Sequence, residues 1–172
     1  MRPIILSCTI DVPRERVFDY LQDVANYPEF TSHFLKDYRL ERLDSRGIGA
    51  AASFRIASRL ATLPLAAPLA SLWAELIVTE VAPPHRLVIE GHGGRLGRNR
   101  LRAVISLTKH DEEMTRLTLD FSTEPATRSD RLREALGART WLRLQWGKAL
   151  QRLRLVLEEG KPSAHAVRVA PG

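Results

Sequence analysis

The chain has 172 residues, of which 44% are hydrophobic and 27% are charged. Such a chain is typical of one globular domain, large enough to bury about two-thirds of its unfolded surface without disulfides or a structural metal. Its single cysteine, Cys8, has no partner for an internal disulfide, and the first residues lack the long apolar core of a signal peptide. We therefore expect a cytoplasmic protein, because that compartment is reducing.

The net charge is +6 and the sequence pI is about 10.1. The basic residues are nearly all arginine, and they are spread along the chain among 20 acidic residues. Nucleic-acid binding usually shows an arginine-rich block or a recognition motif, so we expect no nucleic-acid partner. An anionic membrane surface and an acidic ligand stay open as partners, because arginine suits both phosphates and carboxylates.

The N-terminal segment predicts a strand followed by two short helices. Residues Ile4–Ile10 have a strand pattern, and Pro13 marks a helix start, since proline has no amide to lose in a first turn. The apolar residues that follow recur at helical spacing: Val17, Phe18, Leu21 and Val24. Asp23 can cap a second short helix, which we expect to end around Pro28.

The rest of the chain predicts strands and then one long helix. A hairpin is expected over 35–43 and 50–57, turning at Gly47 and Gly49. Four more strands are expected over 72–81, 86–91, 100–108 and 114–122. Residues 130–159 have an amphipathic helical pattern, with leucines and Trp146 on one stripe. Residues 1–160 then form the domain, and 161–172 are expected to be a disordered tail.

Successive connections of an antiparallel meander alternate between the two ends of the sheet. The short turns at Gly47, Pro83 and Asp111 should therefore share one end, and the longer connections over 58–71, 92–99 and 123–129 should share the other. Long loops can open without disrupting a sheet, so we expect a ligand entrance at their end.

Several segments carry a resemblance to a known family. They are DVANYPEF at 23–30, EVAPPHRL at 80–87, TRLTLDF at 115–121 and the terminal segment 150–160. The chain resembles the START-like helix-grip (SRPBCC) superfamily, in the branch of bacterial polyketide cyclase/dehydrase and lipid-transport proteins. The resemblance covers roughly residues 3 to 160. It implies an α+β fold in which an antiparallel sheet grips the C-terminal helix around a hydrophobic cavity, and known members bind lipids, polyketides or quinones.

Catalytic and cofactor motifs are missing from the sequence. The glycine-rich stretch at 91–97 has Leu96 where a dinucleotide fingerprint needs its third glycine. The five histidines have no paired spacing, and Cys8 has no cysteine partner, so the sequence offers no zinc ligand set. No GxSxG elbow is present. We therefore expect no cofactor and no metal, and we assign no catalytic residue.

The candidate ligand-binding residues come from separate elements that a helix-grip fold would bring together. Six are aromatic: Phe30, Phe34, Phe54, Trp73, Phe121 and Trp146. We expect at least half of these to line a cavity and the others to fill the core. Strand alternation and the helical stripe add Ile89, Leu119, Leu136 and Leu142.

Polar groups of the cavity are harder to choose from the pattern. His92 is the leading candidate, with Glu75 beside it. Arg143 and Arg139 project onto the apolar stripe of the last helix, opposite Trp141, so one of them is a candidate anchor for a ligand carboxylate or phosphate. Gly147 costs the helix about 1 kcal/mol against alanine, and a close approach to the sheet or to a ligand would explain it.

Residues 60–70 form an uncharged, apolar connection that is too short to span a bilayer. A lid, a membrane contact, a dimer contact and ordinary packing all stay open for it. A monomer and a homodimer are both compatible with the sequence.

We interpret the chain as a binding or carrier protein for a lipophilic small molecule. The alternative is a cyclase, aromatase or dehydratase that uses the same cavity, with a residue such as His92 moving protons. A third class is an interaction module that uses its apolar loop and basic surface.

Overall fold

A computed structural model of the chain describes residues 3–57, 71–93, 98–111, 113–124, 139–159 and 168–169. The strands are β1 (Ile4–Ile10), β2 (Leu35–Leu40), β3 (Ala51–Ala57), β4 (Ser71–Ala82), β5 (Arg86–Gly93), β6 (Asn99–Lys109), β7 (Thr115–Glu124) and β8 (Arg168–Val169). The helices are α1 (Arg14–Leu21), the 3-10 turn η1 (Val24–Asn26), α2 (Tyr27–Thr31) and α4 (Arg139–Glu159).

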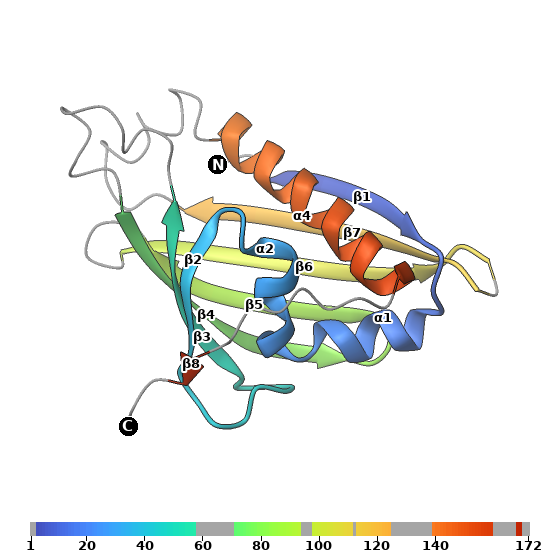
Figure 1. The fold of residues 1–172 in the computed structure, drawn as a ribbon, viewed down its shortest axis with the longest axis horizontal. Coiled ribbons are helices and arrows are strands. Elements are labelled where there is room, and N and C mark those ends of the chain that lie inside the picture. Colours follow the sequence, from blue (N-terminus) through green and yellow to red (C-terminus); the bar gives the residue numbers. More distant parts are fainter. Residues whose placement is uncertain are drawn as a thin grey trace.

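The strands form one sheet in the order β1-β7-β6-β5-β4-β3-β2-β8. Every pairing is antiparallel except that of β2 with β8. Figure 1 shows α4 lying along one face of the curved sheet, with α1 and α2 on the same side. The predicted α+β helix-grip fold and its seven meander strands are confirmed. The short strand β8 was not predicted, since it lies in the segment expected to be a disordered tail.

The core lies between the sheet and the helices. On β6 and β7 every second residue is buried, as the alternation predicted: Ala103, Ile105, Leu107, Leu117, Leu119 and Phe121. From the other side α4 contributes Ala149, Leu150, Leu153 and Leu157. These residues belong to one continuous apolar cluster. Its burial is the main favourable term for folding, because each fully buried large apolar side chain contributes about 1.5–3 kcal/mol.

The N-terminal helices begin as predicted but end differently. Pro13 immediately precedes α1, and the Asp23 carboxylate accepts the Ala25 amide at 3.0 Å to cap η1. The expected helix end at Pro28 is wrong, because Pro28 lies in the first turn of α2, which continues to Thr31. Proline lacks only an amide that a first turn leaves unbonded anyway, so it can start a helix as well as end one.

The connection from β2 to β3 is longer than the tight hairpin that the sequence indicated. Strand β2 ends at Leu40, and Gly47 and Gly49 both adopt positive φ, at 71° and 88°. The Gly47 amide donates to the Gln22 carbonyl at 3.1 Å, and the Gly49 amide donates to the Val78 carbonyl at 2.8 Å. The turn is therefore fixed by bonds to the α1–η1 junction and to β4, which a local pattern does not reveal.

The strand ends bordering the long connections lie together, as the meander predicted. Ala57 pairs with Ser71, Gly93 with both Ala74 and Asn99, and Glu124 with Arg100. The first described residue of α4 is at this end too, since the Arg139 guanidinium donates to the Pro3 carbonyl at 3.2 Å. The connections themselves, including the apolar segment 60–70, lie outside the described residues, so the expected entrance and lid stay predictions.

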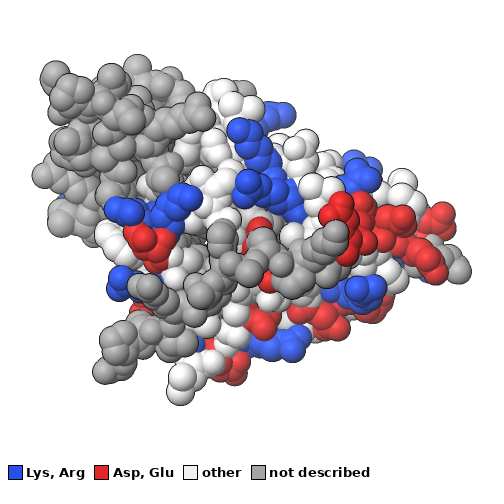
Figure 2. Space-filling model, in the orientation of Figure 1, with Lys and Arg blue, Asp and Glu red and all other residues white. Residues whose placement is uncertain are grey.

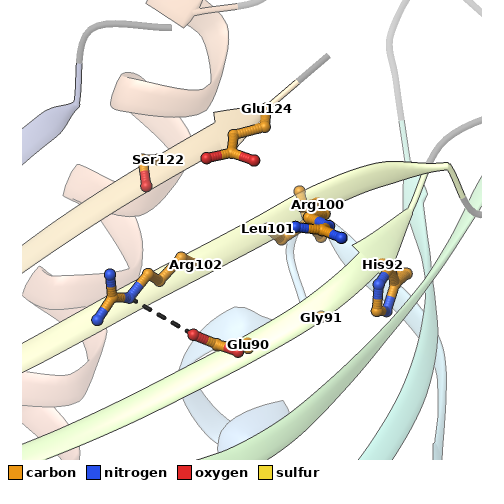
Figure 3. Close-up of a pocket in the computed structure, with 8 residues that line it drawn as sticks. All are labelled: Glu90, Gly91, His92, Arg100, Leu101, Arg102, Ser122 and Glu124. Atoms are coloured by element: carbon orange, nitrogen blue, oxygen red, sulfur yellow. Dashed lines mark ion pairs between the residues drawn. The ribbon is translucent and has the colours of Figure 1, made fainter. Parts of the chain in front are cut away.

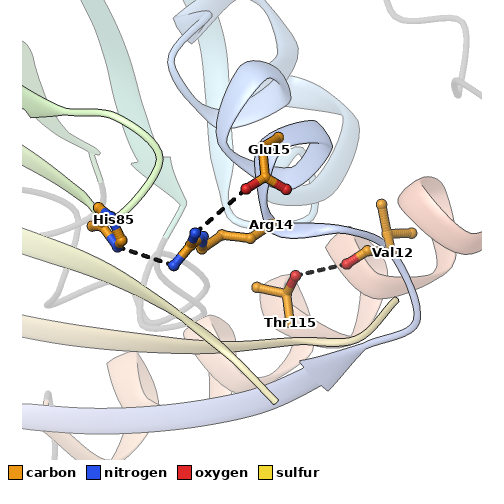
Figure 4. Close-up of polar contacts among 5 residues, drawn as sticks. All are labelled: Val12, Arg14, Glu15, His85 and Thr115. Atoms are coloured by element: carbon orange, nitrogen blue, oxygen red, sulfur yellow. Dashed lines mark hydrogen bonds and ion pairs between the residues drawn. The ribbon is translucent and has the colours of Figure 1, made fainter. Parts of the chain in front are cut away.

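The opposite end of the sheet is closed by polar contacts to the start of α1 (Figure 4). The buried Thr115 hydroxyl donates to the Val12 carbonyl at 2.6 Å. Arg14 lies 3.1 Å from Nδ1 of His85, and the His85 carbonyl accepts the Leu107 amide at 2.8 Å. These bonds fasten the β1–α1 junction to the β4–β5 turn and to β6 and β7.

Helix α4 corrects two expectations. A Cβ built on Gly147 would meet nothing within 4 Å, so this glycine does not serve a close approach to the sheet. Trp141 does not lie on the free side of the helix, since its ring packs against Phe34 at 6.3 Å between centroids. The helical pattern assumed one buried stripe, but α2 and Phe34, which follows it, cover a second side of the first half of α4.

Thr115→Val should lower the free energy of unfolding by about 1–3 kcal/mol, because the Val12 carbonyl loses its partner inside the protein. Thr108→Val is the matched control: Thr108 is exposed and its hydroxyl bond to the Arg116 carbonyl is long, at 3.4 Å. The control should change stability by less than about 0.5 kcal/mol in urea unfolding. Equal losses in the two variants would contradict this role for Thr115.

Gly147→Ala should raise the free energy of unfolding by about 1 kcal/mol, because alanine favours the helix and its methyl group meets open space. Gly91→Ala should do the opposite, since its Cβ would overlap the Glu75 carbonyl oxygen on the neighbouring strand. Thermal unfolding of both variants checks the pair. A destabilised Gly147→Ala protein would restore a packing role for this glycine.

Candidate functional site

Aromatic rings gather where the first half of α4 meets the sheet and the start of β2. Phe34 lies at the centre, edge-on to Trp146 at 5.3 Å and to Trp141 at 6.3 Å between ring centroids. Phe121 of β7 packs against the other side of Trp146 at 5.5 Å. We call Phe34, Phe121, Trp141 and Trp146 the aromatic site. It joins α4, β7 and the turn between α2 and β2, near the end of the sheet where the long connections begin.

Trp146 carries a polar atom into this apolar surrounding. Its indole Nε1 is buried and has no hydrogen-bond partner among the described residues. Burying an unpaired donor costs about 1–3 kcal/mol, and native proteins leave few such groups. Among the described residues, the indole N–H is therefore a donor without an acceptor within the aromatic site.

His33 borders the aromatic site through its ring contact with Phe34, at 4.8 Å between centroids. Its Nε2 lies 3.1 Å from the Gln145 carbonyl, so Nε2 carries the proton in the neutral tautomer. Its Nδ1 is buried and makes no hydrogen bond among the described residues. Burial lowers the pKa of His33, although the Gln145 and Phe30 carbonyls partly offset this. The neutral imidazole thus presents a lone pair at Nδ1.

Most of the predicted site residues lie in the core cluster between the sheet and α4. Six of them are buried: Phe30, Phe34, Phe54, Ile89, Leu119 and Phe121. Leu142 and Trp146 are partly buried and pack against that cluster. Leu136 lies outside the described residues. The structure thus brings together eight of the twelve residues, and their contact with a ligand stays a prediction.

Three predicted site residues point elsewhere. Trp73 is 48% exposed and lies under the Arg39 guanidinium, 5.9 Å from its ring centroid. The residues of β4 that face the core are Ala74, Leu76 and Val78. This strand is apolar at successive positions, so its sequence did not show which side chains face inward. His92, next to the buried Gly91 and Gly93, is exposed on the outer face of the sheet. Arg143 is exposed on α4. The expected orientation of all three is wrong.

Trp141 of the aromatic site and His33 beside it were not among the sequence candidates. His33 lies two residues after the end of α2, and Trp141 was projected onto the free side of α4. A signal for His33 did exist, because it stands beside Phe34, which was chosen. No local pattern could have placed Trp141, since its burial depends on α2 packing alongside α4.

The outer face of the sheet holds a separate, polar pocket of about 470 Å³ (Figure 3). Its walls come from β5, β6 and β7: Glu90, Gly91, His92, Arg100, Leu101, Arg102, Ser122 and Glu124. Two opposite charges inside it form a pair, since Arg102 Nε lies 3.6 Å from Glu90 Oε1. The pocket is open and mainly polar, so it lacks the apolar enclosure that a lipophilic ligand requires.

Cys8 is a poor nucleophile. Burial raises the pKa of its thiol to about 11, an effect that Glu158 reinforces and Arg154 opposes. At neutral pH the thiol is therefore protonated. Within the described part of the chain, no three His, Cys, Asp or Glu side chains lie close enough together to hold a metal ion. The helices described include none long and apolar enough to cross a membrane.

The family described as "Polyketide cyclase / dehydrase and lipid transport" matches residues 4–158. The chain belongs to this family. The match includes every described strand of the meander and nearly all of α4, so the aromatic site lies within it. No curated protein matches the chain.

Several solved structures share the fold at low sequence identity. The KanY protein (ms6282) aligns with a TM-score of 0.67 at 14% identity, over 91% of this chain and 97% of its own. TTHA0849 from Thermus thermophilus aligns with a TM-score of 0.64 at 12% identity, over 92% of this chain and 99% of its own. DynU16, a protein of the dynemicin biosynthetic locus, aligns with a TM-score of 0.62 at 18% identity over 98% of this chain. The present chain spans about half of DynU16, at 51% of its length.

Proposed function

We propose that this protein binds a lipophilic small molecule carrying a hydrogen-bond-accepting oxygen, between the sheet and the first half of α4. The observation that carries the proposal is the buried, unpaired indole N–H of Trp146, surrounded by aromatic rings. A ligand oxygen would supply the missing acceptor. The remaining affinity would come from burial of apolar area, at roughly 25 cal/mol per Å².

Membership of the family supports this ligand class. Its description names polyketide chemistry and lipid transport, and both polyketides and lipids combine apolar carbon with carbonyl or ester oxygens. A planar or extended apolar molecule would stack on Phe34 and Trp146 while its oxygen faces Nε1. The ligand would reach the site from the end of the sheet where α4 begins.

The indole donor makes a prediction about ligand preference. The protein should bind 2-acetylnaphthalene about 2- to 10-fold more tightly than 2-ethylnaphthalene, because only the ketone accepts a hydrogen bond worth about 0.5–1.5 kcal/mol. Titration calorimetry, or displacement of a bound fluorescent dye, measures both constants. Saturation should occur at one ligand per protein.

The two tryptophan variants test the assignment. Trp146→Phe keeps a ring but removes the donor, so it should abolish the preference for the ketone. Trp73→Phe is the matched control, because Trp73 lies half-exposed on the outer face, and it should leave the preference unchanged. Equal binding of the two naphthalenes by the parent protein, or a preference that survives Trp146→Phe, would refute the indole anchor.

A second candidate function is enzymatic, and His33 favours it. Its neutral imidazole has a lone pair at Nδ1 beside the aromatic site, which suits a general base that removes a proton next to a ligand carbonyl. In this role His33 replaces His92, which lies on the wrong face of the sheet. The reaction class would be a cyclisation or dehydration of a polyketide-like chain.

A 3-hydroxyacyl thioester serves as the probe for this second candidate. If the protein is a dehydratase, the parent and His92→Gln should both form the enoyl product, and His33→Gln should not. Binding of 2-acetylnaphthalene should persist in all three proteins, which separates a lost base from a lost site. Binding without any enoyl product in the parent would leave the carrier function as the better account.

A further inference from the structure

The outer side of α4 has a composition unlike that of an ordinary solvated helix face. It presents three cationic side chains, Arg143, Lys148 and Arg152, and two large apolar ones, Leu144 and Leu155. All five are exposed, and the leucines are 59% and 52% exposed. We call these five residues the basic–leucine face.

Helical geometry places four of these residues on one side of α4, with the two leucines between the flanking cations. Leu144, Lys148 and Arg152 follow at intervals of four residues, and Leu155 comes three residues later, so they share one side of an α-helix. Arg143 is also exposed, but it lies about 100° around the helix from Leu144, on the flank opposite Lys148 and Arg152. The buried stripe of Ala149, Leu150, Leu153 and Leu157 lies on the other side. Trp141, three residues before Leu144, is on the same line but packs against Phe34, so the exposed face begins at Leu144 and lies opposite the buried stripe.

The positive charge of this face has one carboxylate on the same side of α4, that of the exposed Glu159 at the C-terminal end of the helix. No aspartate or glutamate occurs between residues 139 and 157. Of the cations on α4, Arg154 pairs with Glu158 at 3.0 Å and Arg139 bonds to the Pro3 carbonyl. Among the described residues, none of the three cations of the face has a carboxylate partner. Figure 2 shows the blue side chains gathered over the first half of α4, apart from the red ones near its C-terminal end.

We propose that the basic–leucine face docks the protein on an anionic lipid bilayer. Cations attract the negatively charged leaflet, while exposed leucines gain by entering the boundary between headgroups and acyl chains. The long arginine and lysine side chains can extend to the phosphates while the leucines insert. Nucleic acid would interact with the cationic side chains but would not bury the exposed leucines, and therefore fits this surface less well.

This assignment differs from the membrane contact that the sequence suggested. That contact was expected at residues 60–70, which lie outside the described residues. Docking through α4 would bring the bilayer against the outer side of the helix whose inner side carries Trp146. A lipophilic ligand could then pass between bilayer and protein over a short path. The docking itself does not depend on the ligand site.

Co-sedimentation with vesicles tests the proposal. The parent protein should bind vesicles of phosphatidylcholine and phosphatidylglycerol in a 7:3 ratio, and should bind phosphatidylcholine vesicles at least about 10-fold more weakly. Raising the salt concentration should weaken the association, because the attraction between charges is screened. The combined variant Arg143→Gln, Lys148→Gln, Arg152→Gln should lose roughly 100-fold in binding, at about fivefold per charge.

A second triple variant controls for net charge. Arg16, Arg42 and Arg116 are exposed and lie neither in the aromatic site nor on α4, and changing all three to glutamine removes the same charge. This control should keep most of its vesicle binding. Leu144→Ser with Leu155→Ser should weaken binding while leaving its dependence on salt. Circular dichroism confirms that each variant is folded, and 2-acetylnaphthalene binding should be unchanged in all of them.

Three results would overturn the proposal. The first is equal binding of the parent to neutral and anionic vesicles. The second is an equal loss in the two triple variants, which would mean that net charge acts without any defined face. The third is tight binding of a single-stranded RNA oligonucleotide that displaces the vesicles and is unaffected by the leucine changes. Failure of ligand binding alone would refute the proposed function and leave the docking face standing.

Discussion

The packing of one stripe of α4 on the concave face of the sheet is the constraint on which the rest of the structure depends. The leucines of α4 complete a core that the sheet and the short helices begin, and without that helix the inner positions of β6 and β7 would face water. Helix α4 contacts both β1 at one edge of the curved sheet and α2, so it links the sheet to the short helices. The closed end of the sheet, fastened by Thr115 and Arg14, holds this arrangement in register.

Against this background, the polar atoms inside the core separate into two groups. Buried hydroxyls are bonded to nearby carbonyls: Tyr27 to Leu21 at 2.9 Å, Tyr38 to Val24 at 2.8 Å and Thr31 to Tyr27 at 2.7 Å. Burial raises the pKa of both tyrosines, so each stays a protonated donor. The Trp146 indole and His33 Nδ1 lack such partners. Two arginine nitrogens, Arg14 Nε and Arg139 Nε, are likewise buried without a partner among the described residues, but only Trp146 Nε1 and His33 Nδ1 lie at the aromatic site, where our proposal places a ligand.

Helix α4 then has two functional sides in our proposals. Its inner side supplies Trp146 to the ligand, and its outer side supplies cations and leucines to a bilayer. The two sides are separated only by the thickness of one helix, so docking and ligand exchange would be close in space although they rest on different residues. The polar pocket on the outer face of the sheet belongs to neither, because the sheet itself separates it from α4 and the aromatic site.

The sequence by itself determined the order of the elements, the antiparallel meander and the inward positions of the regular strands. Alternation in β6 and β7 is a local property, and it correctly placed Leu119 and Phe121. The shared end of the long connections also follows from chain order alone. Family resemblance added the grip of the sheet on the last helix.

Only the tertiary structure decided which of the candidate site residues lie in contact with one another. Strand β4 is apolar on both faces, so the outward direction of Trp73 had to come from its pairing with Arg55. Trp141 is packed and Arg143 is exposed, the reverse of what the sequence predicted. A helical projection does not include neighbouring elements, and here α2 covers a second side of α4. The unpaired state of Trp146 is likewise a property of the assembled core, since a hydrogen-bond partner can come from any distance along the chain.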